Sequence, residues 1–346
     1  MTLERFDFET AEDDWRRVAD RSDNIFDSWE WARTWWHHFR SGEELRLLGL
    51  RGAGHEPRVL LPLTRSWRLG VPMLRFLGHG PGDQLGPICA VEDRDLAAEG
   101  LRQALEESSD WAIFLGERLP GDWPVDRTLG GRSLSFESSP ALVVGGRSWD
   151  DLLKERSSNF RQQVRRRERK LVRDHGLKFR FTADPGELDR DLDLLFGLHV
   201  ARWEGQDTRF SQTRRFHRAF AALALERGWL RLWIAEVGGR PAAAWYGFRY
   251  AGIESFYQTG RDPAFDSTSV GFVLLTHTIR SAVEDGVSEY RFLRGGEHYK
   301  GRFSNRDVGL RTLAVARTAV GRVAVDTAAT LARRSRGRGL MRQAPI

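Results

Sequence analysis

Hydrophobic residues recur along the chain at helix-like and strand-like spacings, in two cycles of similar order. The first cycle predicts a polar helix over 11–19 and an aromatic helix over 27–39. It continues with strand-like alternation, a helix over 93–107 and a further strand, and the strand segments are EELRLLGLRG, EPRVLLPLTRSW, PMLRFLGH and DWAIFLGERL. This pattern predicts a mixed α/β domain over residues 1–147.

The second cycle begins at Ser148 with one long helix that ends at Gly176, a residue suited to a helix C-cap. A strand, two amphipathic helices and three strands joined by glycine turns follow. The segment STSVGFVLLTHTIRSAVEDG then predicts a helix, and two strands come after it, of which VGLRTLAVA is the last. The second cycle therefore predicts an α/β domain over 148–316.

Length and composition exclude several classes of protein. The chain has 346 residues, of which 40% are hydrophobic and 29% charged, as in a folded globular protein. It contains no run of eighteen apolar residues, so we expect no transmembrane segment. MTLERFDFET lacks the apolar stretch of a secretory signal, so the cytoplasm is the expected compartment. The single cysteine excludes an internal disulfide and a cysteine-built metal cluster, and we expect no metal.

The chain is basic, and its basicity has two interpretations. Lys and Arg number 54 against 48 Asp and Glu, an excess of six positive charges. This excess fits an anionic partner, and it also fits the arginine-rich usage of a GC-rich genome. The end of the chain, LARRSRGRGLMR, carries five arginines in twelve residues. We expect 317–346 to be a basic, solvated tail, with weak contact to anionic lipid or RNA as the alternative.

An arginine-rich face marks the long helix. Arg161, Arg165 and Arg169 follow at a spacing of four, beside a face of apolar residues. Guanidinium groups match the paired oxygens of phosphate and carboxylate, so this face is a candidate anion-binding surface. A solvated basic helix is the simpler alternative.

The segment HVARW places three candidate residues at the end of a later helix. His199 is a candidate general base, because an unperturbed histidine titrates close to neutral pH. Arg202 and Trp203 accompany it. The alternative is structural, with Trp203 packed and His199 as a polar spacer.

Two loops carry the remaining chemistry of the second half. In YQTGRDPAFDSTSVG a turn precedes a helix, whose free N–H groups and dipole can bind an anion; its residues are Thr268, Ser269, Val270 and Gly271. In FLRGGEHYKGRFSN the acid Glu297 could accept a proton, while the ammonium of Lys300 could polarise a carbonyl or hold an anionic leaving group. A helix cap and a glycine-rich hairpin with exposed charges are the alternatives for the two loops.

In the first half, GHGPGDQLGP follows a strand but lacks the G-x-G-x-x-G spacing of a dinucleotide site. It contains Asp83.

The element order and these motifs resemble the GNAT-like acyltransferases of the CelD type, which are similar to the FemAB aminoacyl transferases. The resemblance covers 148–316 well, and 1–147 more loosely through NIFDSWEWARTWWHHF and LGHGPGDQLGP. It implies an α/β fold of tandem GNAT-like domains, each a mixed, mostly antiparallel sheet flanked by helices. The first domain, 1–147, would be degenerate, and the second, 148–316, would carry the activity.

The same resemblance implies a function and a set of site residues. The chain would move an acyl group from acyl-CoA, such as acetyl-CoA, to an amine or hydroxyl by direct attack, in polysaccharide or cell-envelope biosynthesis. The acceptor would be a small molecule, a glycan or a peptide. The resemblance implies catalytic roles for Lys300, Glu297 and His199, and donor binding by Thr268, Ser269, Val270 and Gly271. It implies acceptor binding by Arg161, Arg165, Arg202, Trp203, Tyr299 and Asp83.

Two other functions stay open. The turn before Gly271 has one glycine where GNAT signatures have several, so an aminoacyl-tRNA donor, as in the FemAB branch, is the first alternative. A non-catalytic binding protein derived from a GNAT fold is the second.

Overall fold

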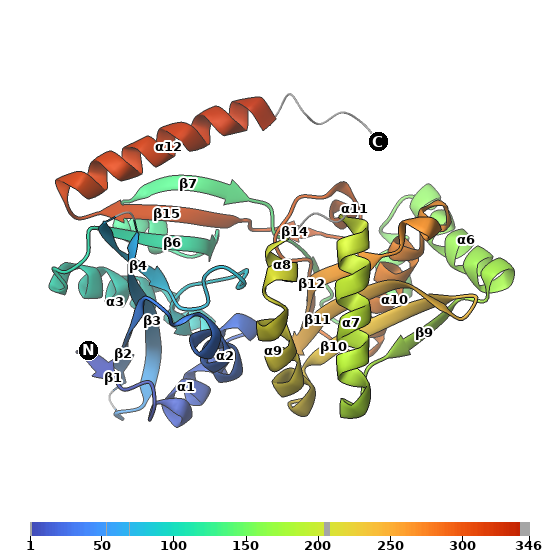
Figure 1. The fold of residues 1–346 in the computed structure, drawn as a ribbon, viewed down its shortest axis with the longest axis horizontal. Coiled ribbons are helices and arrows are strands. Elements are labelled where there is room, and N and C mark those ends of the chain that lie inside the picture. The colour runs from blue at the N-terminus through green and yellow to red at the C-terminus, as the bar shows by residue number, and fades with distance from the viewer. Residues whose placement is uncertain (1, 53, 69, 204–207, 340–346) are drawn as a thin grey trace. The chain divides into compact units, whose positions relative to one another are not determined.

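The computed structural model describes residues 2–52, 54–68, 70–203 and 208–339, and the chain forms two compact units (Figure 1). The first unit consists of residues 1–139, 294–296 and 307–346, and the second of 140–293 and 297–306. The second unit is thus inserted between two strands of the first. Both are α/β units built on mixed, mostly antiparallel sheets with flanking helices, which confirms the predicted fold class.

The sheet of the first unit has the strand order β1-β2-β3-β4-β6-β15-β7, with β5 paired to β3. Only β4 and β6 run parallel among its described pairs. Its strands are β1 (Leu3–Phe6), β2 (Glu43–Arg51), β3 (Pro57–Arg68), β4 (Val71–Phe76), β5 (Ile88–Cys89), β6 (Ile113–Pro120), β7 (Arg132–Glu137) and β15 (Leu310–Ala316). Its helices are α1 (Glu12–Ala19), η1 (Ile25–Asp27), α2 (Trp29–Phe39), η2 (Val91–Asp93), α3 (Arg94–Glu107), α4 (Val125–Leu129) and α12 (Ala319–Gly339).

The C-terminal segment differs from the expected solvated tail. α12 runs over β15 and β7 (Figure 1), and Val325 on it is buried in a small core with Ile113 and Ala314, while Ala329, one turn later, is also buried. A Cβ added to Gly321 would lie 2.4 Å from the carbonyl oxygen of Ala112, the residue before β6. The backbone of α12 therefore lies directly against the first sheet at this point. The expectation of a solvated tail is therefore wrong for 319–332, and residues 340–346 lie outside the described part.

The sheet of the second unit has the order β14-β8-β13-β12-β11-β10-β9. Its strands are β8 (Pro140–Val143), β9 (Lys178–Phe181), β10 (Leu230–Val237), β11 (Arg240–Tyr250), β12 (Ile253–Arg261), β13 (Glu289–Arg291) and β14 (Arg306–Asp307). Its helices are α5 (Trp149–Lys154), α6 (Ser158–His175), α7 (Pro185–Arg202), α8 (Arg209–Gln212), α9 (Arg214–Glu226), η3 (Pro263–Thr268), α10 (Val270–Glu284) and α11 (His298–Gly301).

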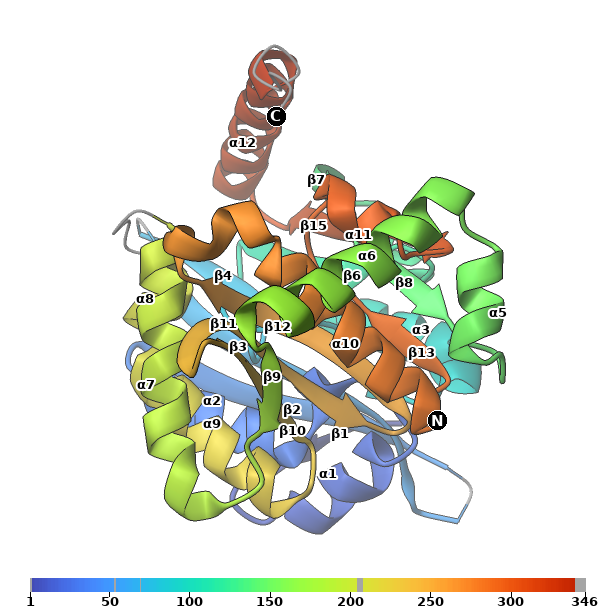
Figure 2. The same cartoon turned by 90° about the vertical axis from the view of Figure 1, so that its right-hand side faces the viewer.

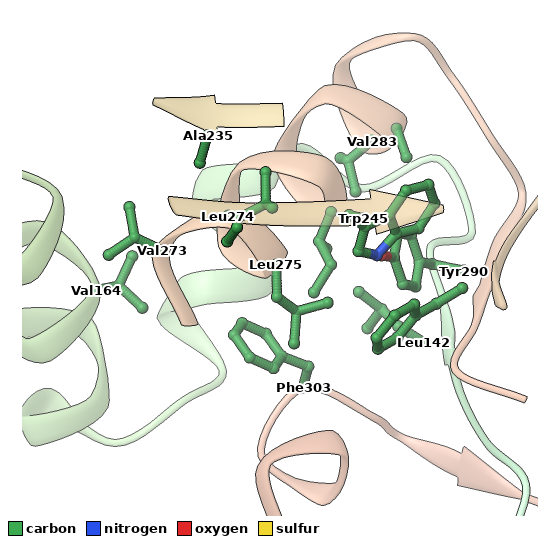
Figure 3. Packing of buried hydrophobic residues seen from close by; sticks show 14 of the residues in the cluster. Leu142, Val164, Ala235, Trp245, Val273, Leu274, Leu275, Val283, Tyr290 and Phe303 are labelled. Atoms are coloured by element: carbon green, nitrogen blue, oxygen red, sulfur yellow. The ribbon is translucent and has the colours of Figure 1, made fainter. Parts of the chain in front are cut away.

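Alternation along β11 separates the two faces of this sheet. Trp245 packs with Leu274 and Leu275 of α10 in the core shown in Figure 3, while Tyr246 lies on the opposite face with Phe248 and the aromatic residues of α9. α6 and α10 cover the first face (Figure 2), and α7 contacts β11 and β12 from the second. The helices on the two faces bring separate sets of side chains to the central strand β12.

Three expectations about elements need correction. The strand 310–316, placed in the second domain from the sequence, pairs with β6 and β7 of the first sheet. Residues 140–143, which the boundary at 147 assigned to the first domain, form a strand that the sequence pattern did not indicate, and this strand pairs with β13 in the second sheet. The long helix over 148–175 is two helices, because the Ser157 hydroxyl accepts a hydrogen bond from the Phe160 N–H and starts α6 anew. Its predicted end is confirmed, with Gly176 at φ +58°.

No described helix has the length and apolarity needed to cross a membrane.

Candidate active site

The central strand β12 diverges from its parallel neighbour. β12 pairs with β13 only over Ile253–Ser255, and its later residues pair with β11 alone. A bulge leaves Tyr257 without an opposite residue on β11. Because a strand edge presents backbone N–H and C=O groups, the second half of β12 offers hydrogen bonds to a ligand lying beside it.

A pocket of about 400 Å3 opens along this strand on the α10 face. Its floor is apolar and aromatic, and charged groups stand at its rim. All of its lining residues belong to the second unit, and they are Arg167, Arg202, Trp245, Phe256, Thr259, Arg261, Phe265, Asp266, Ser269, Val270, Gly271, Phe272, Leu274, Leu275 and Tyr299.

The N-terminal turn of α10 forms one end of the pocket. Ser269 adopts a left-handed conformation with φ +60°, and its side chain makes no capping hydrogen bond. A Cβ added to Gly271 would meet only the Arg261 Cδ, at 3.7 Å, so the chain leaves space above this residue. Of the four residues expected to bind a donor, Ser269, Val270 and Gly271 line the pocket. Thr268 does not, because its hydroxyl donates to the Phe265 carbonyl at 2.6 Å.

Two guanidinium groups converge near this turn, and the sequence analysis missed both. Arg167 of α6 lies 4.9 Å from the centre of the Phe272 ring, and Arg302 lies 5.7 Å from the same ring. Burial lowers the pKa of Arg167, and the positive charge of Arg302 lowers it further. Arg167 has no ion pair among the described residues, whereas Arg261 is paired with Asp266 at 2.6 Å. The rim thus carries positive charge that the chain itself leaves uncompensated.

The arginines expected to bind an acceptor on this helix lie elsewhere. Arg161 donates to the carbonyl oxygens of Lys154, the last residue of α5, at 3.3 Å and of Arg156 at 2.6 Å. Arg165 is exposed, with a guanidinium nitrogen 4.0 Å from Asp150. Neither lines the pocket. Helical spacing separates them from Arg167, which follows Val164 by three positions on the packed face.

His199 is buried and hydrogen-bonded through both ring nitrogens. Nδ1 lies 3.0 Å from the Thr259 carbonyl oxygen, which can only accept, so Nδ1 carries the proton. Nε2 lies 2.9 Å from the Thr208 hydroxyl and accepts from it. Burial lowers the pKa of His199, which keeps the ring neutral. The geometry therefore uses this histidine to tie α7 to β12, close to the pocket residue Thr259.

Of the other two residues of HVARW, Arg202 lines the pocket and Trp203 does not. Trp203 is 45% exposed, with the Arg202 guanidinium 5.6 Å from its ring. Tyr299, expected to meet an acceptor, also lines the pocket, and burial raises the pKa of its hydroxyl to about 12. The phenol is therefore protonated at neutral pH.

Lys300 and Glu297 form an ion pair at the base of α11. The Lys300 Nζ lies 2.9 Å from Glu297 Oε2 and 6.0 Å from the ring of the pocket residue Phe256. Lys300 is only 4% exposed, whereas the Glu297 side chain is 49% exposed. A largely desolvated ammonium is thus held near the pocket by a carboxylate that solvent reaches.

Asp83 belongs to the first unit and is not among the residues that line this pocket. It lies 3.5 Å from Arg118 and 3.9 Å from Arg294, both in the same unit. No group of three or more potential metal ligands occurs among the described residues.

Comparisons with known proteins find one family whose domain resembles part of the second unit. Residues 158–301 match the sequence profile described as Acetyltransferase (GNAT) domain. Comparison with curated protein sequences gives no significant match.

Several solved structures share the fold. A crystal structure of FemX has a TM-score of 0.63 at 12% identity, with 90% of this chain and 97% of that chain covered. The C-terminal domain of a putative lysylphosphatidylglycerol synthetase from Agrobacterium fabrum has a TM-score of 0.57 at 11% identity, covering 94% and 95%. L-PGS from Bacillus licheniformis has a TM-score of 0.52 at 11% identity, covering 84% and 89%. The chain therefore combines a fold shared with FemX and a segment, 158–301, that matches the GNAT acetyltransferases, an acyltransferase family.

Proposed function

We propose that this chain transfers an acyl group from an acyl-CoA thioester to an amine or hydroxyl acceptor by direct attack, within the pocket beside β12. One observation carries the proposal. A single pocket joins an anion-accepting end, formed by the first turn of α10 and Arg167, to its wall at Phe256, and behind that wall lies the buried Lys300, paired with the half-exposed Glu297.

The donor's phosphates would lie against the N–H groups of Val270 and Gly271, where the helix dipole and Arg167 favour negative charge. Its thioester arm would run along the apolar floor toward Phe256. The unpaired edge of β12 would then donate a backbone hydrogen bond to the thioester carbonyl.

The residues near the pocket can account for each bond and proton in a direct attack. The acceptor nitrogen or oxygen forms a bond to the carbonyl carbon, its proton passes to Glu297, and the carbon–sulfur bond breaks. The ammonium of Lys300 stabilises the negative charge that develops on the carbonyl oxygen or the departing thiolate. Tyr299 and Arg202 would orient the acceptor. His199 would act as a positioning residue for β12, because both of its nitrogens are occupied.

Calorimetric titration with acetyl-CoA and longer acyl-CoA thioesters tests the donor. We expect saturable binding that weakens in Arg167→Ala. Absence of binding for every chain length would overturn the proposal.

A substitution of Lys300 tests the chemistry. Lys300→Met should bind acyl-CoA normally and lose activity by roughly 10²-fold or more, since one electrostatic donor to a developing charge contributes about that factor. Lys170→Met, on the exposed face of α6, is the matched control and should keep full activity.

Aminoacyl transfer from tRNA is the second candidate. The fold shared with FemX and the exposed row of Arg165, Arg166 and Arg169 favour it. A charged tRNA would then bind with a steep salt dependence, and acyl-CoA would not bind. As acceptor we propose a small molecule, glycan or peptide of polysaccharide or cell-envelope assembly; the basis is the resemblance given above. We propose the cytoplasm as the compartment.

A further inference from the structure

α12 carries apolar residues on two different faces, and the described part of the chain covers only one of them. Gly321, Val325 and Ala329 repeat every four residues and are buried against the first sheet. Val320, Val323 and Leu331 lie on another face of the helix and are 66%, 68% and 60% exposed. They are three of the eight large hydrophobic side chains found exposed in the described part of the chain. This second stripe faces solvent.

The same segment carries the net charge of the chain. Residues 317–346 contain seven arginines and one aspartate, an excess of six positive charges that equals the formal net charge of all 346 residues. Asp326, the only acid, lies 3.2 Å from Arg132, so its charge is compensated within the unit. Arg322 is exposed and has no ion pair among the described residues. The segment therefore combines an uncovered apolar stripe with a concentrated positive charge.

We propose that α12 is a docking surface for an anionic lipid bilayer. The helix would lie in the plane of the membrane, with Val320, Val323 and Leu331 entering the boundary between headgroups and acyl chains. The positive charge that the sequence concentrates in 317–346 would favour a surface of negative headgroups. The aliphatic stripe favours a bilayer over a nucleic acid, because phosphates and bases gain nothing from exposed valine and leucine side chains. The proposal does not depend on the acyl transfer proposed above.

Sedimentation with lipid vesicles tests the proposal on the full chain. We expect binding to vesicles of equal parts phosphatidylglycerol and phosphatidylcholine, and little binding to phosphatidylcholine alone. The variant Val320→Ser/Val323→Ser should reduce partitioning to the anionic vesicles about tenfold, because two apolar side chains no longer gain from insertion. Val172→Ser, which changes an exposed valine of α6, is the matched control and should bind as the wild type does.

A second variant separates charge from insertion. Arg333→Gln/Arg334→Gln/Arg336→Gln should also weaken binding about tenfold, since each basic residue near an anionic surface adds a comparable increment, and high salt should mimic it. These substitutions lie in the first unit, so denaturant unfolding compared with that of the wild type verifies that this unit still folds.

Three results would overturn the proposal. The first is absence of binding to the anionic vesicles. The second is binding that survives Val320→Ser/Val323→Ser and disappears with the arginine substitutions, as a polycation binding RNA would behave. The third is a dimer in light scattering that dissociates with Val320→Ser/Val323→Ser, which would assign the stripe to a second copy of the chain.

Discussion

At the scale of single residues, two glycines near the pocket serve opposite purposes. A Cβ at Gly260 of β12 would lie 2.4 Å from the backbone nitrogen of His199, so the absence of a side chain lets α7 approach the strand. Gly271 faces open space, and the protein's own packing does not require it. Gly260 therefore serves the fold, and we propose that Gly271 serves the ligand.

The same substitution at the two sites should give opposite results. Gly260→Ala should destabilise the second unit by about 1–3 kcal/mol, because a backbone contact cannot move aside as a side chain can. Gly271→Ala should leave stability unchanged or raise it by up to about 1 kcal/mol, the helix preference of alanine, while weakening thioester binding. Denaturant unfolding and calorimetric titration measure the two effects. A stable Gly260→Ala protein would contradict the close contact.

A buried histidine makes the second unit sensitive to acid. His217 of α9 is fully buried, and neither ring nitrogen has a hydrogen-bond partner among the described residues. Burial lowers the pKa of this ring to about 3. Below about pH 6.5 this histidine is therefore protonated in the unfolded chain and neutral in the folded chain. Acid consequently favours unfolding.

The expected loss can be measured. Between about pH 7 and pH 5 the His217 ring alone should lower the free energy of unfolding by about 2 kcal/mol. His217→Phe should remove that part of the pH dependence, and denaturant unfolding at the two pH values compares the proteins. Equal slopes would mean that the ring is protonated or solvated in the folded state.

At the scale of elements, α6 divides its arginines by helical spacing. Phe160, Val164 and Leu171 are buried, and Arg167 shares their side of the helix and reaches the pocket rim. Arg165 follows the neighbouring face and remains in solvent. Arginines that are close in the sequence of α6 thus differ in their surroundings, since one lines the pocket and the other lies in solvent.

This difference predicts unequal effects on donor binding. Arg167→Ala should raise the dissociation constant of acyl-CoA about tenfold, the value of one charge-assisted hydrogen bond to a phosphate. Arg165→Ala, on the same helix, should change it little at physiological salt, because exposed charges are screened. Titration of both variants compares them directly, and equal losses would indicate a general attraction instead of a specific contact.

At the scale of the whole molecule, the last strand of the first sheet, β15, follows the entire second unit in the sequence. β15 pairs with both β6 and β7, although 172 residues separate it from the end of β7. The second unit, in contrast, takes all of its residues from 140–306, and the whole pocket is built from them. The first unit therefore needs segments from both sides of the second unit, whereas the second unit is built from one stretch of the chain.

Fragments should reveal this difference. A chain of residues 140–306 should fold cooperatively and bind acyl-CoA, as circular dichroism and titration would detect. A chain of 1–139 should remain largely unfolded, because β6 and β7 lose the strand between them and expose apolar surface. Joining 1–139 to 307–346 through a short linker should restore folding. A well-folded 1–139 fragment would contradict this account.

The sequence alone was sufficient for the features that depend on neighbouring residues. Periodicity located most helices and strands, and glycine chemistry located the end of α6 at Gly176. The turn at Ser269–Gly271 and the pair of Glu297 and Lys300 were recognised as candidate chemistry, and the structure brings both close to one pocket. These signals are local, because backbone geometry and short side-chain spacings act over a few residues.

Only the tertiary structure decided which elements meet. β15 pairs in the first sheet although its residues were expected in the second domain, and β8 pairs in the second sheet although its residues were assigned to the first, since alternation along a strand reports a buried face but not its partner. Arg167 was missed for the same reason. Its helical spacing indicates only that it lies on the packed side of α6, and the pocket beside it is formed with Phe272 of α10, which is distant in the sequence. His199 gained its two hydrogen bonds from β12 and from the segment that precedes α8. Such pairings depend on contacts between residues far apart in the chain, and no local pattern encodes them.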